Sequence, residues 1–319
     1  MSEANGAVAV KARRAKKNLL KNEISRPTNV ILHIIFLIGV LFCVYPTLVV
    51  IGSSLTDEHT LLTYGTNVWP REFSTVAYRY LSTAGGSIMH AYGVTILITV
   101  VGTALFVLIT SMFAYPLSRP EFPWKRQFSL FIYITMVFGG GLIPWYIVVA
   151  QILHMRGTVF ALFIPGAFGG YWAFVLRTFI TSNIPGELIE SARIDGSSEF
   201  NNYVKIILPL AKAGLATAAF FTALGLWNEW YNCLLFNALN QNTWDLGFVL
   251  YKIITQVQYM SNLSSAAARG AVFSNVNFQP PAHGVQFALC CIAVGPIIVI
   301  YPFFQRFFVK GLVIGAVKG

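Results

Sequence analysis

The sequence predicts an all-α membrane protein with six transmembrane helices, and three observations support this. Hydrophobic residues make up 56% of the 319 residues and charged residues only 11%, whereas soluble domains usually carry about 25% charged residues. Six apolar stretches are long enough to cross the hydrocarbon core, which takes roughly 20 residues. Basic residues gather on alternate sides of these stretches. These patterns favour one membrane domain over a soluble fold.

The membrane domain is predicted to cover residues 30–309, between a basic tail (1–29) and a short C-terminal tail (310–319). The first apolar run is too long for the hydrophobic region of a secretory signal, so it is expected to be a retained span. In chain order, the six predicted spans are Val30–Gly52, Ala91–Leu117, Phe128–Ile152, Val159–Ile180, Ala213–Phe236 and Val285–Val309.

The N-terminal tail carries seven of the 22 lysines and arginines. Two interpretations stay open: the tail rests on anionic lipid headgroups, or it is a solvated segment that only fixes orientation. Either one accounts for the net charge of +10 by topology, without a nucleic-acid partner.

Charge asymmetry predicts the orientation of the spans. With six spans both termini share one side, and about 17 basic residues fall on that side. The opposite segments hold five, namely Arg71, Arg79, Arg156, Lys252 and Arg269. Because positive charge stays on the cytoplasmic side, both termini are predicted to be cytoplasmic, in a multi-pass membrane protein.

Two segments depart from regular spans. Span four contains Pro165, Gly166, Gly169 and Gly170, which favour a kinked or broken helix, either as part of a pore wall or as a packing kink. The outer segment 237–284 is long, polar and rich in Asn, Gln and Ser. A connection of that length is usually functional or disordered.

A coupling loop, residues 182–208, is predicted on the cytoplasmic side between spans four and five. Ser182 or Asn183 can cap a short helix, and Gly196 permits the sharp turn that ends it. Ser198 can cap a second short helix, and Pro209 precedes span five. The predicted helix, turn and helix suit docking into a groove on a partner, or lying on the membrane surface.

These residues resemble the EAA loop of ATP-binding-cassette (ABC) importer permeases. The resemblance rests on Glu190-Ser191-Ala192, Gly196 and the later Ile207-Leu208-Pro209. Ser191 stands where the second position is usually alanine, and Ala213 where a proline often follows. These departures affect fine docking geometry rather than the assignment.

Two further stretches resemble carbohydrate permeases within that family. Trp227-Asn228-Glu229-Trp230 resembles their Trp-Asn signature, and residues 304–319 are similar to the tail of the maltose-type (MalG-like) second permease. The resemblance covers roughly spans two to six. It implies the type I ABC importer permease fold, with a cytoplasmic EAA-type coupling helix.

The resemblance also implies a division of labour. A second permease subunit would complete a heterodimer, two copies of an ABC ATPase would bind ATP and Mg, and an extracytoplasmic solute-binding protein would deliver an oligosaccharide. The chain has no G-x-x-x-x-G-K-[ST] phosphate loop, so it is expected to be non-catalytic and to bind no cofactor or metal. Residues implied in ATPase coupling are Glu187, Glu190, Ser191, Ala192, Asp195, Gly196, Phe200, Leu208 and Pro209.

Asp195 has a second interpretation, in which its side chain only caps the turn at Gly196. Candidates for the substrate pathway are the aromatic and polar residues Trp172, Trp227, Asn228, Glu229 and Tyr231. Sugars bind to aromatic faces and to a few oriented polar groups, but Trp and Tyr also collect at membrane interfaces. Glu229 stands apart because an ionisable group near a span is costly and often functional.

Two other transporter hypotheses stay open at this stage. One is an ABC permease for a non-sugar solute such as an amino acid or peptide, because the EAA-like loop serves those importers too. The other is an ion-coupled secondary transporter, which would need acidic or His relays at depth and internal repeats. Most spans lack acidic residues, which argues against it.

Overall fold

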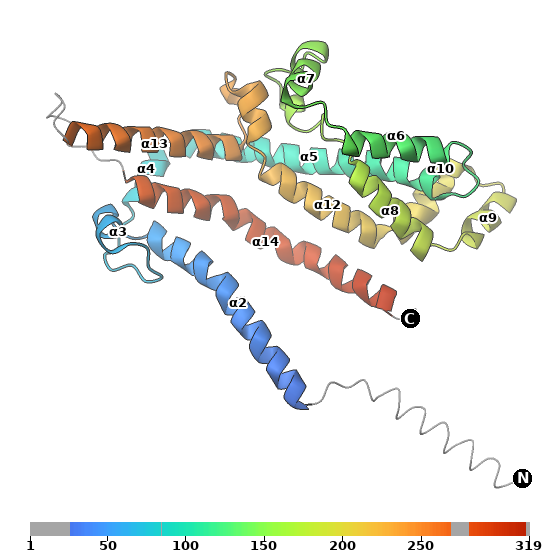
Figure 1. The fold of residues 1–319 in the computed structure, drawn as a ribbon, viewed down its shortest axis with the longest axis horizontal. Coiled ribbons are helices and arrows are strands. Elements are labelled where there is room, and N and C mark those ends of the chain that lie inside the picture. Colours follow the sequence, from blue (N-terminus) through green and yellow to red (C-terminus); the bar gives the residue numbers. More distant parts are fainter. Residues whose placement is uncertain (1–25, 84, 269–280, 317–319) are drawn as a thin grey trace, which may run out of the picture.

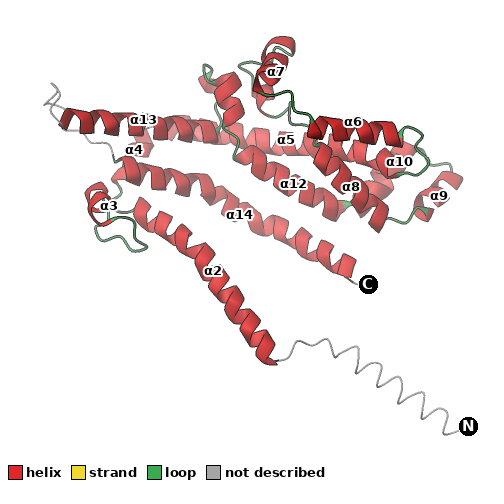
Figure 2. Ribbon diagram, in the orientation of Figure 1, coloured by secondary structure: helices red, strands yellow, loops and turns green. Residues whose placement is uncertain are grey.

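The computed structural model describes residues 26–83, 85–268 and 281–316, and this part of the chain is helical throughout, apart from loops and one isolated β-bridge between Thr56 and Phe73 (Figure 2). The α-helices are α2 (Arg26–Ser54), α3 (Glu58–Tyr64), α4 (Val76–Thr83), α5 (Gly85–Ser118), α6 (Lys125–Val137), α7 (Leu142–Ile147), α8 (Gly170–Asn183), α9 (Glu187–Ile194), α10 (Glu199–Asn202), α11 (Leu208–Leu210), α12 (Lys212–Trp227), α13 (Leu246–Ala268) and α14 (Ala282–Ala316). Short π-helical or 3₁₀ turns cover Val148–Ile152, Val159–Leu162, Tyr203–Ile207, Cys233–Asn237 and Gln241–Thr243.

Helix α5 is the centre of the packing. Helices α8 and α12 pack against it, α14 packs against α12, and α2 packs against α14 (Figure 1). Buried apolar side chains of α4, α5, α12, α13 and α14 form one cluster around Trp227 and Leu250. A second cluster joins α5 and α8 to the segment after α8, so α5 connects both clusters.

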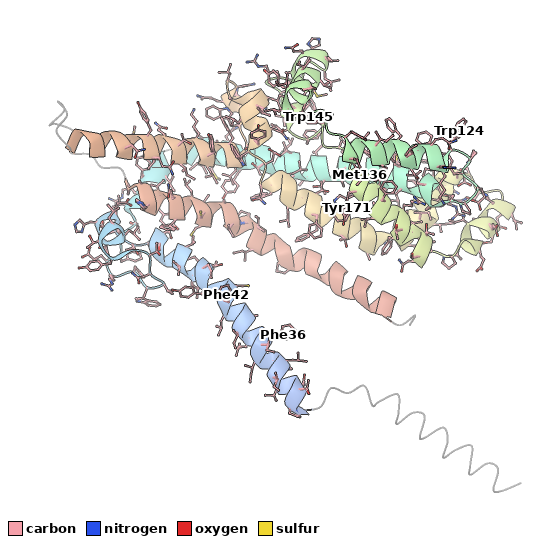
Figure 3. All side chains as sticks on the ribbon, in the orientation of Figure 1. Phe36, Phe42, Trp124, Met136, Trp145 and Tyr171 are labelled. Atoms are coloured by element: carbon pink, nitrogen blue, oxygen red, sulfur yellow. The ribbon has the colours of Figure 1, made fainter. Side chains whose placement is uncertain are left out.

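Helix α2 has an apolar surface that the rest of the described chain leaves uncovered. None of its most apolar 18-residue window is buried, and Phe36 and Phe42 are 70% and 80% exposed (Figure 3). In water this surface would be unfavourable by about 25 cal/mol for each Å². The helix is therefore built to face lipid or a partner.

Two described helices are long and apolar enough to cross a membrane without a break, Pro27–Ser54 and Gly85–Ser118. Two bent pairs raise that number to four if each pair is one span. In the described residues, α14 qualifies only as a shorter apolar helix over Ala282–Ile298. The six predicted spans therefore stay a prediction.

Predicted span three is not one continuous helix. Helices α6 and Leu142–Ile152 meet at an angle of 111°. The bend follows a run of three glycines, of which Gly141 has a φ of +81°, a conformation that side chains disfavour. Expecting a regular helix over Phe128–Ile152 was wrong because this run was given no weight.

Predicted span four is broken, as its glycines and proline indicated. A 3₁₀ turn covers Val159–Leu162, irregular backbone follows, and α8 begins only at Gly170. With 14 residues, α8 would span about 21 Å, less than the roughly 30 Å hydrocarbon core. The interrupted backbone over Val159–Ile180 therefore agrees with the kinked or broken helix that the sequence predicted.

Outer segment 237–284 is partly ordered, because it contains the 23-residue helix α13. Asp245 begins this helix, and its Oδ1 accepts a hydrogen bond of 2.7 Å from the backbone N–H of Phe248, an N-cap arrangement. Thr95 Oγ1 on α5 accepts a 2.8 Å bond from the N–H of Leu246. Both bonds fix where α13 starts, and residues 269–280 lie outside the described residues.

Helix α14 is capped by a carboxylate from another helix. Glu58, in the first turn of α3, accepts hydrogen bonds of 2.9 Å from the backbone N–H groups of His283 and Gly284. A negative charge at a helix N-terminus satisfies free donors and favours the helix dipole. Glu58 thus joins the first outer segment to the last long helix. The predicted C-terminal tail lies partly within α14, and residues 317–319 lie outside the described residues. Of the predicted basic tail 1–29, residues 26–29 belong to α2 and residues 1–25 lie outside the described residues.

The Asp245 cap predicts a dependence of stability on pH. Burial, with the nearby Glu229 charge adding to it, raises the pKa of Asp245 to about 7. Because the folded state then binds a proton that the unfolded state releases, stability is lost as pH rises from about 4 towards 7 and above. The melting temperature of the detergent-solubilised protein should therefore rise between pH 8 and pH 5.

The Asp245→Asn variant should lose this part of the pH dependence, because the amide keeps the Oδ1 acceptor but cannot titrate. Asp195→Asn, at an exposed carboxylate, is the matched control and should keep the wild-type slope. Equal slopes for Asp245→Asn and the wild type would contradict this account.

Candidate functional site

The segment between α8 and α12 folds as short helices joined by a glycine turn. Helix α9 covers Glu187–Ile194, and Gly196 follows it with a φ of +80°. The N–H of Ser197 donates to the carbonyl of Ala192 at 2.9 Å, which satisfies one free carbonyl at the helix end. Because no other atom lies within 4 Å of a Cβ built on Gly196, backbone conformation alone favours glycine there.

The start of α9 differs from the prediction. Asn183 is the last residue of α8, where its Nδ2 donates to the Phe179 carbonyl at 2.9 Å. Gly186 occupies the N-cap of α9 and supplies no side-chain hydrogen bond. The cap expected from Ser182 or Asn183 was therefore wrong, because α8 extends further than its sequence pattern indicated.

One face of α9 is held by the protein and the other is free. Ile189 is fully buried beside Ile184 and Tyr203, whereas Leu188 is 44% exposed and Ile194 is 87% exposed. Ile189 therefore anchors the helix. The exposed surface therefore includes two large apolar side chains, which the surface of a purely solvated helix seldom needs.

The acidic side chains of α9 also point away from the core. Glu187, Glu190 and Asp195 are exposed. Within the described part of the chain, their carboxylates make no hydrogen bond or ion pair. Asp195 therefore does not cap the Gly196 turn through its side chain. Ser191 donates its hydroxyl to the Leu188 carbonyl at 3.1 Å, and Ala192 is half-buried.

The second part of the loop leads back into the helix bundle. Ser198 caps α10, and its Oγ accepts from the N–H of Asn201 at 3.3 Å. Phe200 on α10 is 68% exposed. A π-helical turn leads to α11, which holds the half-buried Leu208 and the exposed Pro209. The helices then bend by 79° into α12.

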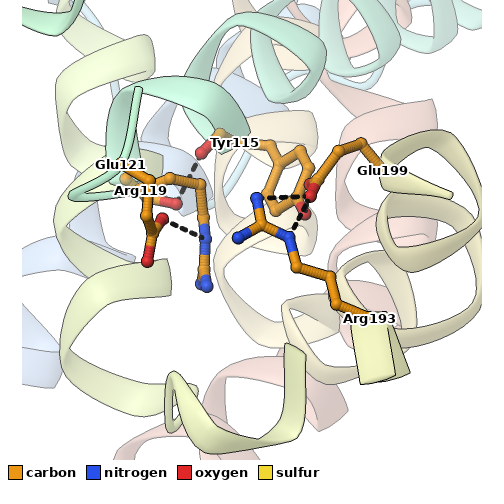
Figure 4. Close-up of polar contacts among 6 residues, drawn as sticks. Tyr115, Arg119, Glu121, Arg193 and Glu199 are labelled. Atoms are coloured by element: carbon orange, nitrogen blue, oxygen red, sulfur yellow. Dashed lines mark hydrogen bonds and ion pairs between the residues drawn. The ribbon is translucent and has the colours of Figure 1, made fainter. Parts of the chain in front are cut away.

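A network centred on Glu199 connects α9 and α10 with α5 (Figure 4). Tyr115 on α5 donates its hydroxyl to Glu199 Oε2 at 2.6 Å. From the other side, Arg193 Nε donates to Glu199 Oε1 at 2.6 Å, and a second guanidinium nitrogen of Arg193 lies 2.6 Å from the same oxygen. The Tyr115 hydrogen bond, assisted by Arg193, holds the pKa of Glu199 below its usual range.

The sequence analysis did not identify this network. Tyr115 lies near the end of an apolar span, and none of Tyr115, Arg193 and Glu199 was among the predicted site residues. A carboxylate three residues after Gly196 could have suggested a partner, but 84 residues separate Glu199 from Tyr115. Only the folded chain brings them together.

The predicted substrate-pathway residues fall into two groups. Trp227, Asn228, Glu229 and Tyr231 lie at the end of α12 and just beyond it, whereas Trp172 lies on α8 and packs against Phe221 of α12. Asn228 and Tyr231 are exposed, and Glu229 is half-buried. Glu229 Oε1 accepts a 2.8 Å bond from the N–H of Asn232, so this carboxylate shapes the turn after α12.

Trp227 has a packing role. It is 7% exposed, its Nε1 donates to the Ala293 carbonyl of α14 at 3.2 Å, and its ring packs against Tyr92 of α5. It also borders a cavity of about 460 Å³ between α5, α12 and α14. Apart from the hydroxyls of Thr99 and Thr103 the cavity lining is apolar, so it lacks the several oriented polar groups that a sugar requires.

Within the described residues, no group of three or more His, Cys, Asp or Glu side chains is arranged to hold a metal ion. Helix α9 offers three free carboxylates and two exposed aliphatic side chains next to Phe200.

Comparisons with known proteins show what the whole chain is similar to. No family model matches the chain. It is 36% identical to Protein LplC of Bacillus subtilis over 90% of this chain and 94% of that protein. It is 31% identical to the polygalacturonan/rhamnogalacturonan transport system permease protein YtcP of the same organism, over 92% and 99%. It is also 27% identical to the arabinooligosaccharides transport system permease protein AraQ of Halalkalibacterium halodurans, over 92% and 99%.

A solved structure shares the fold. A chain of a bacterial ABC transporter involved in the import of the acidic polysaccharide alginate superimposes with a TM-score of 0.73 at 23% identity. The match covers 89% of this chain and 97% of that one. At this identity the likeness establishes the fold alone.

The Glu199 network predicts how firmly α9 is held. Tyr115→Phe removes the hydroxyl that donates to Glu199 and leaves the ring in place. Since a hydrogen bond to a charged group contributes about 1.5–3 kcal/mol, backbone amides of residues 187–199 should lose at least about tenfold of their protection in hydrogen exchange.

Tyr203→Phe is the matched control, because it removes a phenol that bonds to Ser111 at 2.7 Å in the same cluster and leaves Glu199 untouched. The account fails if both variants raise exchange in residues 187–199 equally.

Proposed function

Because this chain belongs to the permease subunits of carbohydrate ABC importers, we propose that it forms half of an ATP-driven membrane pathway for an oligosaccharide. Membership rests on two relatives that share 36% and 31% identity with at least 90% of the chain. The cargoes named for the relatives are oligosaccharides or polysaccharides, which supports sugar over an amino acid or peptide.

The proposed assembly contains a second permease subunit, two copies of an ABC ATPase and an extracytoplasmic solute-binding protein. ATP and Mg would bind to the ATPase subunits, and this chain would carry no cofactor. The uncovered apolar surface of α2 supports a position against lipid or the second permease. The distribution of basic residues supports a bacterial inner-membrane location with both termini in the cytoplasm.

Helix α9 is proposed to be the coupling helix that docks on the ATPase. The observation that carries this is its division into an anchored face and a free face. Ile189 is fully buried, while Ile194 and Phe200 are 87% and 68% exposed. Apolar side chains next to free carboxylates form a mixed surface that can enter a cleft and pair with basic groups there. The other proposed coupling residues, Glu187, Glu190, Ser191, Ala192, Asp195, Gly196, Leu208 and Pro209, lie on this loop.

Outer segment 237–284, which includes α13, is proposed to contact the solute-binding protein. Trp172, Trp227, Asn228, Glu229 and Tyr231 stay candidates for the pathway. The exposed Asn228 and Tyr231 are better placed to meet a sugar than the buried Trp227.

The function is tested by uptake into proteoliposomes that contain the complete importer. Labelled oligosaccharide should accumulate only when ATP and the solute-binding protein are both present. Uptake driven by an ion gradient without ATP would instead favour a secondary transporter, and uptake of amino acids or peptides alone would reject the sugar cargo.

The coupling role predicts that two glycines flanking α9 respond differently to the same substitution. Gly196→Val places a β-branched side chain at a φ of +80°, where it is strained. ATP hydrolysis should continue while sugar uptake falls, so the ratio of ATP hydrolysed to sugar imported should rise several-fold.

Gly186→Val is the matched control, because Gly186 has a φ of −61° and open space around it. That variant should keep a ratio close to the wild-type value. A normal ratio for Gly196→Val, in protein that inserts normally, would refute the coupling role of this turn.

A further inference from the structure

Arg119 follows the last residue of α5 and is nearly enclosed. Its backbone N–H donates to the Pro116 carbonyl at 3.1 Å, and its side chain is only 10% exposed. A lone cation directly after an apolar helix usually extends to water or headgroups. Here the side chain instead lies between Glu121 and the Arg193–Glu199 pair (Figure 4) and lines a cavity.

The guanidinium of Arg119 lacks a close partner. Its Nε is buried without a hydrogen bond. Glu121 Oε2, the nearest carboxylate oxygen, lies 3.8 Å from that nitrogen, too far for a hydrogen bond. No hydrogen bond joins the guanidinium to the described part of the chain. A buried charge with free donors is unfavourable unless a partner satisfies them.

The neighbouring charges are already engaged. Glu199 accepts from both Tyr115 and Arg193, so it does not serve Arg119. Glu121 is 42% exposed and held only by the long ion pair, so another carboxylate can replace it at little cost. Arg119 is therefore the charge in this network whose donors have no close acceptor in the described chain.

Open space lies directly beside Arg119. A cavity of about 440 Å³ is bordered by Arg119, Tyr115, Phe122, Phe200 and Tyr203, which is room for a side chain of a second protein. A second cavity of about 320 Å³ also reaches Arg119 from below α9, past Glu187 and Glu190. The walls belong to the coupling loop and to the α5–α6 turn, and exposed Phe200 forms part of the first cavity's rim.

We propose that Arg119 is the receptor for a carboxylate side chain of the ATPase subunit, which enters the 440 Å³ cavity when that subunit docks on α9. The inference rests on the proposed function. An arginine fork binds a carboxylate through two parallel hydrogen bonds, which would satisfy donors that the described residues of this chain leave free. A phosphate headgroup offers the same charge, and a cross-linking experiment separates the two sources, because only a carboxylate of the ATPase gives a permease–ATPase product.

The Arg119→Lys variant tests this directly in the complete importer. The substitution keeps the positive charge, and a carbodiimide joins the introduced amine to a carboxylate in contact with it, forming an amide with loss of water to the reagent. Treated with carbodiimide, the assembled variant should give a permease–ATPase product. Peptide mapping should place the link between the introduced amine and an Asp or Glu of the ATPase, and wild-type importer and Arg119→Met should lack that link.

A link from the introduced amine to Glu121 or Glu199 of its own chain, or no link in an importer that is assembled, would overturn the proposal. Arg119→Met should also weaken binding of the ATPase subunit at least about 30-fold, since truncating one side of a buried charge pair is costly. Unchanged binding by Arg119→Met overturns it as well.

The proposed function is checked separately by ATP-dependent uptake in the wild-type importer. If that uptake is normal and the Arg119→Lys variant forms no link to the ATPase, only the role of Arg119 fails. If the wild type shows no ATP-dependent sugar uptake, the proposed function fails first.

Discussion

The carboxylate of Glu199 is the point at which the free helix of this protein is tied to its membrane helices. One carboxylate oxygen accepts a hydrogen bond of 2.6 Å from the Tyr115 hydroxyl of α5, and the other accepts one of 2.6 Å from the Arg193 guanidinium. A helix of eight residues such as α9 would be marginal alone in water. Buried Ile189 and the Glu199 network therefore supply the order that its length cannot. With both in place, a force applied to the exposed face of α9 is transferred to α5, around which the bundle packs.

The same constraint explains why the loop combines rigid and free surfaces. Gly196 allows a reversal in three residues, so Arg193 before the turn and Glu199 after it can meet. Docking then needs no further ordering of α9, which lowers the entropic cost of binding. Buried Ile189 and the Glu199 network hold the inner side of the loop. A partner can contact the exposed side chains, which are Ile194, Phe200 and three carboxylates. Arg119 extends that surface inward, because its guanidinium has no close acceptor among the residues that the structure describes.

Local rules in the sequence predicted the elements whose causes are local. Length and apolar composition identify α2 and α5, a glycine at the end of a short amphipathic run predicts the turn at Gly196, and Ser198 is a recognisable cap. The bend after Phe138 had a visible signal in three successive glycines, which a simple count of apolar residues ignores. Helix α13 was missed because its composition is mixed and polar, and its start depends on Thr95, about 150 residues away in the chain.

The candidate site was predicted in part. Its outward residues belong to one continuous stretch, so a family pattern can identify them. The residues that hold them come from other helices. Tyr115 of α5 bonds to Glu199, and Ile180 of α8 belongs to the same buried cluster as Ile189. No spacing rule connects either pair. Trp227 shows the converse, because its place in a signature-like tetrapeptide suggested substrate contact while the fold uses it for packing against α14.

The central claim is that α9 moves together with α5 when the importer works. Spin labels at Ile194→Cys and Leu108→Cys, in a background without the exposed native cysteines Cys43 and Cys290, give the distance between α9 and α5 by pulsed electron resonance. The account predicts the same distance distribution in nucleotide-free and ATP-bound importer, while labels on α9 and on the ATPase subunit report a change. A shift of the α9–α5 distance on ATP binding would contradict it.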